Sequence, residues 1–396
     1  MRKEKIPRKI YLYPSVFKLH TSYRTLLDRP PQGYLFVTGK QSMRKKSIEA
    51  LKKNAIAKWM YHLYIRTFKS STLFERAIKD SKPLPQDINL VFSMGTIYRG
   101  THPYIMEILD NPFSITGYNY DLFMKNKELI SSDLESENCK RIICSHETAL
   151  SFMKQEFPPA VASKCVLVRS AIEECSLHLI PHRGFCLLFV GSTTNPDDFY
   201  IKGGLEALNA FEQASLHNDI SLIIRCKIPP ELVHRIKSQK KITVIENEIP
   251  YSQLQQLYIS SDVFILPGHH FHLMAMLEAM SYGLPILALD SYAFEDFIQS
   301  GKNGFLIKKS DKIKGYNDKS YPTNVKTSEF LHDIKRGDER VINELAEKIE
   351  FLANHSATLR KMSKHCKSVI RKRFSISGRN RALKAIFDSA LKQTAK

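Results

Sequence analysis

The sequence contains no hydrophobic run long enough to cross a membrane. Its most apolar stretch, residues 184–191 (GFCLLFVG), is far shorter than the roughly 18 apolar residues that a spanning helix needs. The basic N-terminus has no long apolar core region and no small-residue cleavage site, so we expect no signal peptide. These absences argue against a secreted or integral membrane protein, and we expect a cytoplasmic one.

Paired cysteines are also missing. The seven cysteines are scattered, and no two stand in the Cys-x-x-Cys spacing typical of zinc and redox sites. This pattern argues against a disulfide scaffold or a zinc site and favours inert thiols in a reducing compartment. The sequence has no helix-turn-helix, RNP or zinc-finger pattern, so nucleic acid is not an expected partner.

The length of 396 residues and the apolar fraction of 43% predict two cores rather than one. Domains usually hold roughly 150–200 residues at this chain length. We expect an N-terminal domain over residues 1–180, a C-terminal domain over residues 181–375, and a last helix over residues 376–396 that crosses back to the N-terminal domain.

Positive charge is concentrated near the start of the chain. Residues 1–82 hold 20 Lys and Arg against 5 Asp and Glu, an excess of +15 out of the net +19. Residues 40–79 are predicted to be helical, with an apolar stripe that includes Trp59 and with lysines and arginines elsewhere. Such a segment can be an ordinary solvated face, or it can dock on an anionic membrane from the cytoplasmic side.

Alternation of short apolar runs with helical patterns predicts an α/β protein. In the first half we expect strands near residues 10 and 34 and at 89–94, 113–116, 141–145 and 165–169. The second half predicts a doubly wound parallel sheet, with strands at 185–191, 220–226, 242–246, 262–267, 285–290 and 304–309. Residues 310–337 read as a polar insertion that forms a mobile loop.

The most informative segment is residues 262–290, which read as strand, turn, helix, glycine and strand. A helix N-terminus at the carboxyl end of a buried strand is suited to binding an anion. Glu278 is the one acidic residue in the apolar helix, and its carboxylate could accept ribose hydroxyls. The segment therefore predicts a bound nucleotide, although an isolated Glu can also be a paired core acid.

Several motifs in the C-terminal half resemble one enzyme family. FVGS (189–192) is followed by KGG (202–204), LEAMSYGLPILALD (277–290), NGFLI (303–307) and a helical ending from residue 345. In this order they resemble the donor-binding domain of retaining glycosyltransferases with the GT-B fold, in family 4 (glycosyl transferases group 1). The resemblance covers about residues 185–380, whereas residues 1–180 resemble the family in architecture only.

The resemblance implies two Rossmann-like domains that face a cleft. A UDP- or GDP-sugar would bind the C-terminal domain and a glycan or lipid-linked envelope acceptor the N-terminal domain, with retention of configuration and with neither a metal nor another cofactor. It also implies that Lys202 and the backbone N–H groups of Leu273 and Met274 hold the diphosphate. The donor-binding residues it predicts are Gly191, Ser192, Lys202, Gly203, Lys227, Ile249, Leu273, Met274 and Glu278.

The sequence departs from the family at several points. His270 stands where the family has a first glutamate facing the donor sugar, Ser192 stands where a basic residue is common, and the glycine-rich acceptor loop is missing. We predict catalytic roles for His270 and His102, with a structural role as the alternative for each. His146 is a weaker candidate, and it and His102 are each expected in a loop that leads from a strand to a helix. The histidines at 269, 270 and 272 are not expected to bind a metal together.

Three functions follow from this pattern. The first is a sugar transferase. The second is a non-catalytic GT-B scaffold with an eroded donor site that docks on a membrane or a protein partner. The third, less favoured, is a nucleotide-sugar epimerase on the same fold, because such an enzyme has no need of a basic membrane-facing helix.

Overall fold

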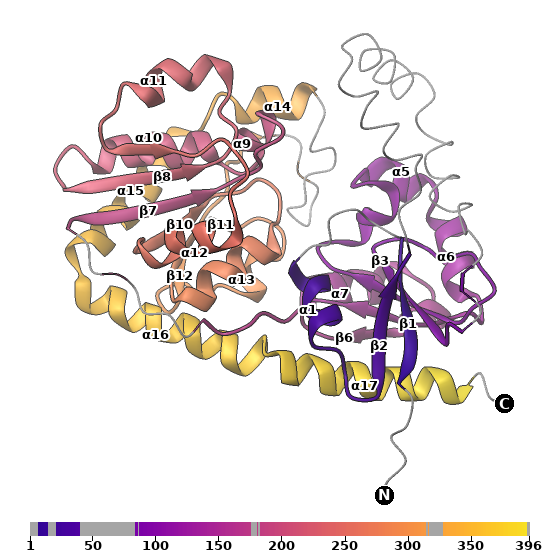
Figure 1. Ribbon diagram of the computed structural model, residues 1–396. Helices are drawn as coiled ribbons and strands as arrows, with labels where there is room; N and C mark the ends of the chain where they lie inside the picture. Colours follow the sequence, from indigo (N-terminus) through magenta and orange to yellow (C-terminus); the bar gives the residue numbers. More distant parts are fainter. Residues whose placement is uncertain are drawn as a thin grey trace, which may run out of the picture. The chain divides into compact units, whose positions relative to one another are not determined.

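The computed structural model describes residues 7–14, 21–39, 84–85, 87–175, 180, 183–313, 316 and 328–393. The chain divides into two compact units, residues 1–171 with 376–396 and residues 172–375 (Figure 1). Each unit contains one six-stranded sheet, and every strand pairing within the two sheets is parallel. The predicted α/β class is therefore confirmed.

The sheet of the first unit has the order β2-β1-β3-β4-β5-β6. Because β2 lies on one side of β1 and all later strands lie on the other, the strand order reverses between β1 and β3. The strands are β1 (Arg8–Tyr13), β2 (Tyr34–Thr38), β3 (Leu90–Met94), β4 (Tyr104–Ile108), β5 (Cys139–Cys144) and β6 (Cys165–Leu167).

Helices flank this sheet. One face is covered by α1 (Thr21–Asp28) and α17 (Ile376–Gln393), whose Phe387 packs edge-on against Phe36 and Phe92. The other helices of the unit are η1 (Pro112–Thr116), α5 (Tyr120–Lys125), α6 (Lys127–Glu135), α7 (Glu147–Glu156) and α8 (Pro159–Ala162). The last helix of the chain thus belongs to the unit that holds the first strand.

Two predictions in the first unit are wrong. The expected strand at residues 113–116 is the 3₁₀ helix η1, because Pro112 favours a helix start and Gly117, with φ of 68°, ends it in the left-handed region. Strand β4 was not predicted, and the segment before it was expected to lead into a helix. All five residues of β4 are buried, so no alternation of apolar and polar residues marks it.

The sheet of the second unit has the order β12-β11-β10-β7-β8-β9. Counted from β7, this is the dinucleotide-binding order, in which the reversal falls between the first and fourth strands, β7 and β10. The strands are β7 (Phe185–Val190), β8 (Ile220–Arg225), β9 (Ile242–Val244), β10 (Val263–Leu266), β11 (Ile286–Leu289) and β12 (Gly304–Ile307). All six strands predicted for this half are present.

Two layers of helices enclose the second sheet. Helices α9 (Asp197–Ile201), α10 (Gly204–Ala214), α14 (Ser328–Ile334) and α15 (Glu339–Asn354) share one core with Leu187 and Ile265. The neighbouring residue Phe264 points to the opposite face, where it meets Tyr258. That second layer holds α12 (Tyr251–Ile259), α13 (Leu273–Tyr282) and α16 (Ser356–Arg373).

Short elements complete the second unit: η2 (Pro230–Leu232), α11 (Val233–Lys237) and η3 (Phe294–Asp296). Between β11 and β12 the helical structure is only the single turn η3. The insertion at 310–337, predicted to be a loop, includes helix α14. The predicted basic helix at 40–79 lies outside the described residues, and no helix within the described ranges is long and apolar enough to span a membrane.

A buried polar pair joins the sheet of the first unit to its last helix. Glu107 at the end of β4 is 8% exposed, and Arg379 on α17 is 7% exposed. Burial raises the pKa of Glu107 to about 7, although a hydrogen bond from Tyr23 and the charge of Arg379 oppose this shift. Burial likewise lowers the pKa of Arg379 to about 10, against the attraction of Glu107.

Arg379 also closes the C-terminal end of α1. Its guanidinium donates to the Thr25 hydroxyl at 2.6 Å and to the carbonyls of Thr25 and Arg29, and Asn380 donates to the Arg29 carbonyl at 2.9 Å. The last carbonyls of a helix have no partner within the helix. Helix α17 therefore supplies the donors that hold α1 in place.

Replacing Glu107 by Gln is expected to remove a pH dependence of stability. Because the folded-state pKa of about 7 exceeds the ordinary 4.5, the folded protein retains a proton that the unfolded chain releases. Wild-type stability therefore falls as the pH rises between these values, and that of Glu107→Gln does not. The gap in unfolding free energy should widen by roughly 2–3 kcal/mol in a urea titration series over this range. A constant gap would contradict the assignment.

Candidate functional site

The carboxyl ends of β7 and β10 form the reversal point of the second sheet, where ligands bind in open α/β folds. Gly191 and Ser192 follow β7. The Gly191 N–H donates to the Arg225 carbonyl and the Lys227 N–H donates to the Ser192 carbonyl, both at 2.7 Å. A Cβ at position 191 would lie 2.2 Å from the Cys226 sulfur, so only glycine fits. The structure thus brings together three predicted donor-binding residues: Gly191 and Ser192 after β7, and Lys227 after the adjacent strand β8.

The turn before α10 is pressed onto the end of β10. Gly203 has φ of +76°, and a Cβ there would lie 2.0 Å from the Pro267 carbonyl oxygen. The His269 N–H donates to the Ile201 carbonyl at 2.9 Å, which joins the same two loops a second time. Lys202, the residue between these two contacts, is therefore held beside the loop that leads into α13.

Among the described residues, no side chain caps the N-terminus of helix α13, no acidic residue lies in its first turn, and Leu273 and Met274 are its first two residues. The Nε2 atom of the neighbouring His272 is buried and has no hydrogen-bond partner in the described part of the chain. Burial, and then the charges of Lys202 and His270, lower the pKa of His272 well below its ordinary value. A neutral imidazole, a lysine and an uncapped helix start are a favourable set for an anion.

The three histidines of this loop have different surroundings. His269 is 1% exposed, and its Nε2 lies 2.9 Å from Glu206 Oε1 while its Nδ1 lies 2.9 Å from the Tyr316 hydroxyl. His270 is half-buried, and its ring centroid lies 5.2 Å from that of His272. His269 is therefore a bonded core residue, whereas His270 and His272 face the region of Lys202.

The network of Glu206, His269 and Tyr316 was not predicted. Glu206 stands in the first turn of α10, three residues after Gly203, and its second carboxylate oxygen is buried without a partner. Burial, and then the charges of Glu206 and Asp290, raise the pKa of Tyr316 well above its ordinary value, so the phenol keeps its proton. The sequence feature that could have indicated this network is Glu206, an acidic residue two positions after the KGG turn.

Glu278 lies in the second turn of α13 and is 8% exposed. The hydroxyl of Tyr258 on α12 donates to Glu278 Oε2 at 3.3 Å, and the ring of Tyr258 stacks on Tyr282 at 4.9 Å. This carboxylate thus has a fixed orientation on the helix that begins at the anion-binding turn. The tyrosine that orients it was also not predicted.

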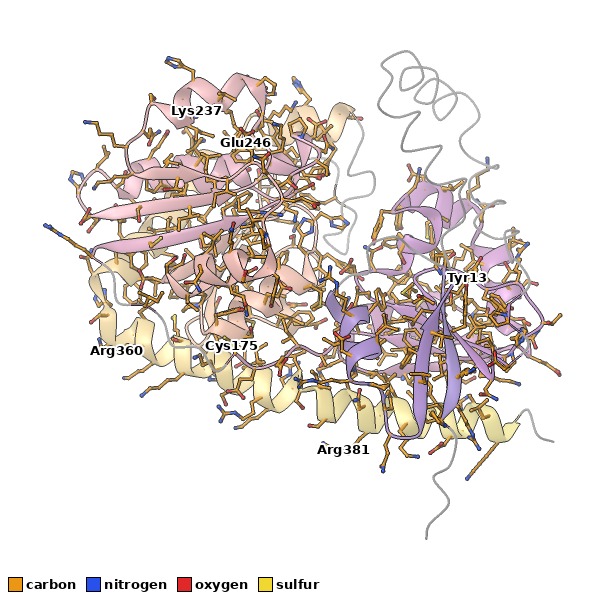
Figure 2. All side chains as sticks on the ribbon, viewed as in Figure 1. Tyr13, Cys175, Lys237, Glu246, Arg360 and Arg381 are labelled. Carbon is orange, nitrogen blue, oxygen red and sulfur yellow. The ribbon has the colours of Figure 1, made fainter. Side chains whose placement is uncertain are left out.

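Two further predicted donor-binding residues are Ile249 and Lys227. Ile249 is half-buried in the segment between β9 and α12. The side chain of Lys227 is exposed, with its Nζ 3.3 Å from Glu246 Oε1; Glu246 is labelled in Figure 2. Neither the position of Ile249 nor the ion pair of Lys227 points to a ligand.

His102 and His146 lie at opposite ends of the strands of the first unit. His102 precedes β4, at the amino end, with its Nδ1 3.3 Å from the Tyr98 hydroxyl. The expectation of a strand-to-helix loop at His102 is therefore wrong, because the next element is a strand. His146 follows β5, at the carboxyl end, where its Nδ1 caps α7 by accepting from the Ala149 N–H at 3.3 Å.

Unpartnered polar atoms gather after β4 in the first unit. Both amide atoms of Asn111 and the Ser114 hydroxyl are buried without a hydrogen-bond partner in the described structure. Asn111 is 0% exposed and follows the carboxyl end of β4. A Cβ on Gly95, just after β3, would lie 3.1 Å from the Ser114 hydroxyl. The sequence gave no signal for this pair beyond its place after a strand.

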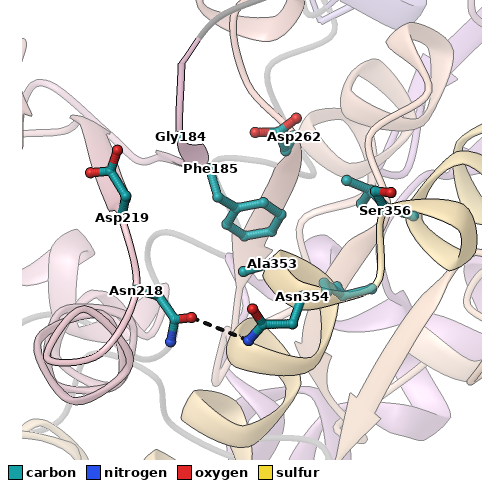
Figure 3. A pocket seen from close by; sticks show the side chains of 10 residues that line it. Gly184, Phe185, Asn218, Asp219, Asp262, Ala353, Asn354 and Ser356 are labelled. Atoms are coloured by element: carbon teal, nitrogen blue, oxygen red, sulfur yellow. Dashed lines mark hydrogen bonds between the residues drawn. The ribbon is translucent and has the colours of Figure 1, made fainter.

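A pocket of about 380 Å³ lies elsewhere in the second unit. Gly184, Asp219 and Asp262 line it, and each immediately precedes a strand, so the pocket is at the amino ends of the strands (Figure 3). The Asn354 amide donates to Asn218 Oδ1 at 3.1 Å along its wall. The pocket is therefore at the opposite end of the strands from Lys202 and the start of α13.

Residues 184–319 match the family model for glycosyl transferases group 1. This segment is a group 1 glycosyltransferase domain. It contains every predicted donor-binding residue. The match confirms the predicted glycosyltransferase domain, and the narrower assignment to family 4 stays a prediction.

Two solved structures are similar to this chain in fold, and one curated relative matches a short segment of it. HepE of Anabaena, in complex with UDP and glucose, has a TM-score of 0.60 at 12% identity over 96% of this chain and 100% of that chain. A glycosyltransferase of Rickettsia africae has a TM-score of 0.58 at 13% identity, over 98% and 99%. Both support the predicted GT-B fold. Sulfoquinovosyl transferase SQD2 of Arabidopsis thaliana is 43% identical over 63 residues, which are 15% of this chain and only 12% of that protein.

Replacing Gly203 by Ala should destabilise the second unit. The new methyl group meets both a left-handed backbone and the Pro267 carbonyl. Gly301→Ala is the matched control, since Gly301 also has a positive φ of +80° but no atom within 4 Å of its Cβ position. In urea unfolding the control should lose about 1 kcal/mol, and Gly203→Ala at least about 1 kcal/mol more. Equal losses would mean that the contact does not hold the turn.

Alanine at His269 should destabilise the protein much more than alanine at His270. His269→Ala leaves the Glu206 carboxylate buried without its partner, so the free energy of unfolding should fall by about 3 kcal/mol. His270→Ala should lower it by less than about 1 kcal/mol. Urea unfolding monitored by circular dichroism measures both. A large loss at His270 would assign that residue a structural role.

Proposed function

We propose that the protein transfers a sugar from a nucleoside diphosphate sugar to a hydroxyl group of a glycan or lipid-linked acceptor. The observation that carries this proposal is the uncapped N-terminus of α13 at the strand-order reversal, with Lys202 held beside it by the Gly203 turn. The group 1 domain match supports the reaction class.

The reaction breaks the bond between the sugar C1 atom and the diphosphate, and a new bond forms from C1 to the acceptor oxygen, whose hydroxyl proton passes to the leaving diphosphate. Negative charge then grows on the leaving diphosphate. The Lys202 ammonium and the free N–H groups of Leu273 and Met274 would stabilise that charge, because donors fixed in advance need no rearrangement. In this proposal they supply the charge that a divalent cation would otherwise supply. Retention of configuration rests on the family resemblance.

The proposed donor is a UDP-sugar. Support comes from the neighbour HepE, whose solved structure contains UDP and glucose. Glu278 would accept the ribose hydroxyls, and Gly191 would allow close approach of the nucleotide to the end of β7. His270 and His272 would face the sugar and the diphosphate.

The acceptor is proposed to bind the first unit near the carboxyl ends of β3 and β4. Asn111 and Ser114 carry unsatisfied donors and acceptors there, which suits the hydroxyl groups of a sugar. The side chains of Ser145 and His146 are already hydrogen-bonded to the carbonyls of Leu109 and Asp110, the two residues that follow β4. His102, at the other end of the strands, is not part of this proposed site.

Replacing Glu278 by Gln should raise the dissociation constant for UDP by at least about tenfold, because a bond to a charged acceptor is lost. Tyr258→Phe is the matched control: it removes the hydrogen bond to Glu278 and leaves the carboxylate in place. Its affinity should change by less than about threefold. Isothermal titration calorimetry measures both, and wild-type affinity in Glu278→Gln would exclude Glu278 as the ribose ligand.

A donor screen separates the transferase from a non-catalytic scaffold. Wild-type protein is incubated with radiolabelled UDP- and GDP-sugars, and transfer or slow hydrolysis is measured together with calorimetric binding of UDP and GDP. Turnover of any donor supports the transferase. If neither nucleotide binds and no donor is turned over, the scaffold is the correct function.

A further inference from the structure

Helix α16 has an unusual charge composition. Its 18 residues, Ser356–Arg373, contain seven Lys and Arg and no Asp or Glu. Helix α15, directly before it in the same unit, contains four Glu against two Lys and Arg, with an ion pair from Arg340 to Glu344. The two helices therefore differ in net charge, and only α16 is strongly basic.

The basic residues of α16 share its outer side. Met362, Cys366 and Ile370 form the buried stripe, at intervals of four residues. Five basic residues are exposed, and one of them, Arg360, is labelled in Figure 2; the five are Arg360, Lys361, Lys364, Arg371 and Lys372. Arg360, Lys364 and Arg371 are spaced four and seven residues apart, so they form one row along the helix.

Most of this charge is not neutralised by the protein. Arg371 pairs with Glu174 at 2.6 Å. Within the described ranges, Lys361, Lys364 and Lys372 pair with no carboxylate. Like charges at such spacings destabilise a helix by a few tenths of a kcal/mol per pair, roughly 0.2–0.5. The row is therefore not explained by the stability of α16 itself.

The inner side of α16 is firmly anchored. The Cys366 thiol donates to the carbonyls of Leu284 and Asn303, both at 3.4 Å. A Cβ on Gly283, at the end of α13, would lie 2.7 Å from the Ser363 hydroxyl, so the two helices are in close contact there. The outer side thus presents a basic row about 17 Å long from Arg360 to Arg371.

We propose that the outer side of α16 docks on an anionic lipid surface. Lipid headgroups offer a flat array of negative charge, and each Lys or Arg near such a surface adds to the attraction. Helix α16 contains no Phe, Tyr or Trp, the aromatic side chains on which single-stranded bases stack. The extended row of charge and the lack of stacking groups therefore favour lipid over nucleic acid. The contact is independent of the proposed sugar transfer, and it is separate from residues 40–79.

The test measures how the full-length protein partitions onto vesicles of phosphatidylcholine with and without phosphatidylglycerol. The variant carries Lys361→Glu, Lys364→Glu and Lys372→Glu. The matched control carries Lys237→Glu, Lys240→Glu and Lys302→Glu, three exposed residues of the same unit with the same change in net charge. The α16 variant should lose at least about tenfold in the partition coefficient on anionic vesicles, and the control less than about twofold.

Several results would overturn the proposal. Wild-type protein that ignores anionic vesicles, equal losses in variant and control, or an unchanged α16 variant each would do so; the last would assign any binding to another segment. A short DNA duplex that binds through α16 while vesicles do not would make the surface a nucleic-acid site. If the Glu variant does not fold by circular dichroism, the corresponding Lys→Gln triple variant replaces it, with a smaller loss expected in the same direction.

Discussion

The contact between the Gly203 turn and the end of β10 is the constraint on which the candidate site depends. A glycine with a positive φ brings the backbone before α10 against the Pro267 carbonyl, and the His269 N–H fixes the same pair of loops. Lys202 is consequently held beside the start of α13. Without this contact, a lysine after β7 and a helix after β10 would be two separate features of a parallel sheet.

The three histidines after β10 show how one short segment can serve two purposes. His269 turns inward and is bonded to Glu206 and Tyr316, which ties the loop to α10 and to the segment after β12. His270 and His272 stay near Lys202, and His272 keeps a buried nitrogen without a partner. The loop is thus anchored through the bonds of His269 to Glu206 and Tyr316, while the buried Nε2 of His272 has no hydrogen-bond partner among the described residues.

The two ends of the second sheet have different chemistry. At the carboxyl ends of the strands, lysine, imidazoles and free N–H groups gather. At the amino ends, the pocket of about 380 Å³ is lined by Asp219 and Asp262, whose carboxylates would repel a diphosphate. The topology of the sheet and the sign of the local charge therefore both favour the carboxyl ends as the candidate anion site.

The sequence alone determined the parallel second sheet, the glycine turn and the helix that starts after β10, because each depends on local patterning of apolar runs and breakers. It failed at residues 113–116, where Pro112 and Gly117 bound a 3₁₀ helix, and at β4, a buried run without alternation of apolar and polar residues. Only the tertiary structure decided that Glu206 and Tyr316 bond His269, that Tyr258 orients Glu278, and that Arg379 closes α1 above Glu107. These pairs lie far apart in the chain, so their contacts depend on strand order and helix packing, which local pattern does not encode.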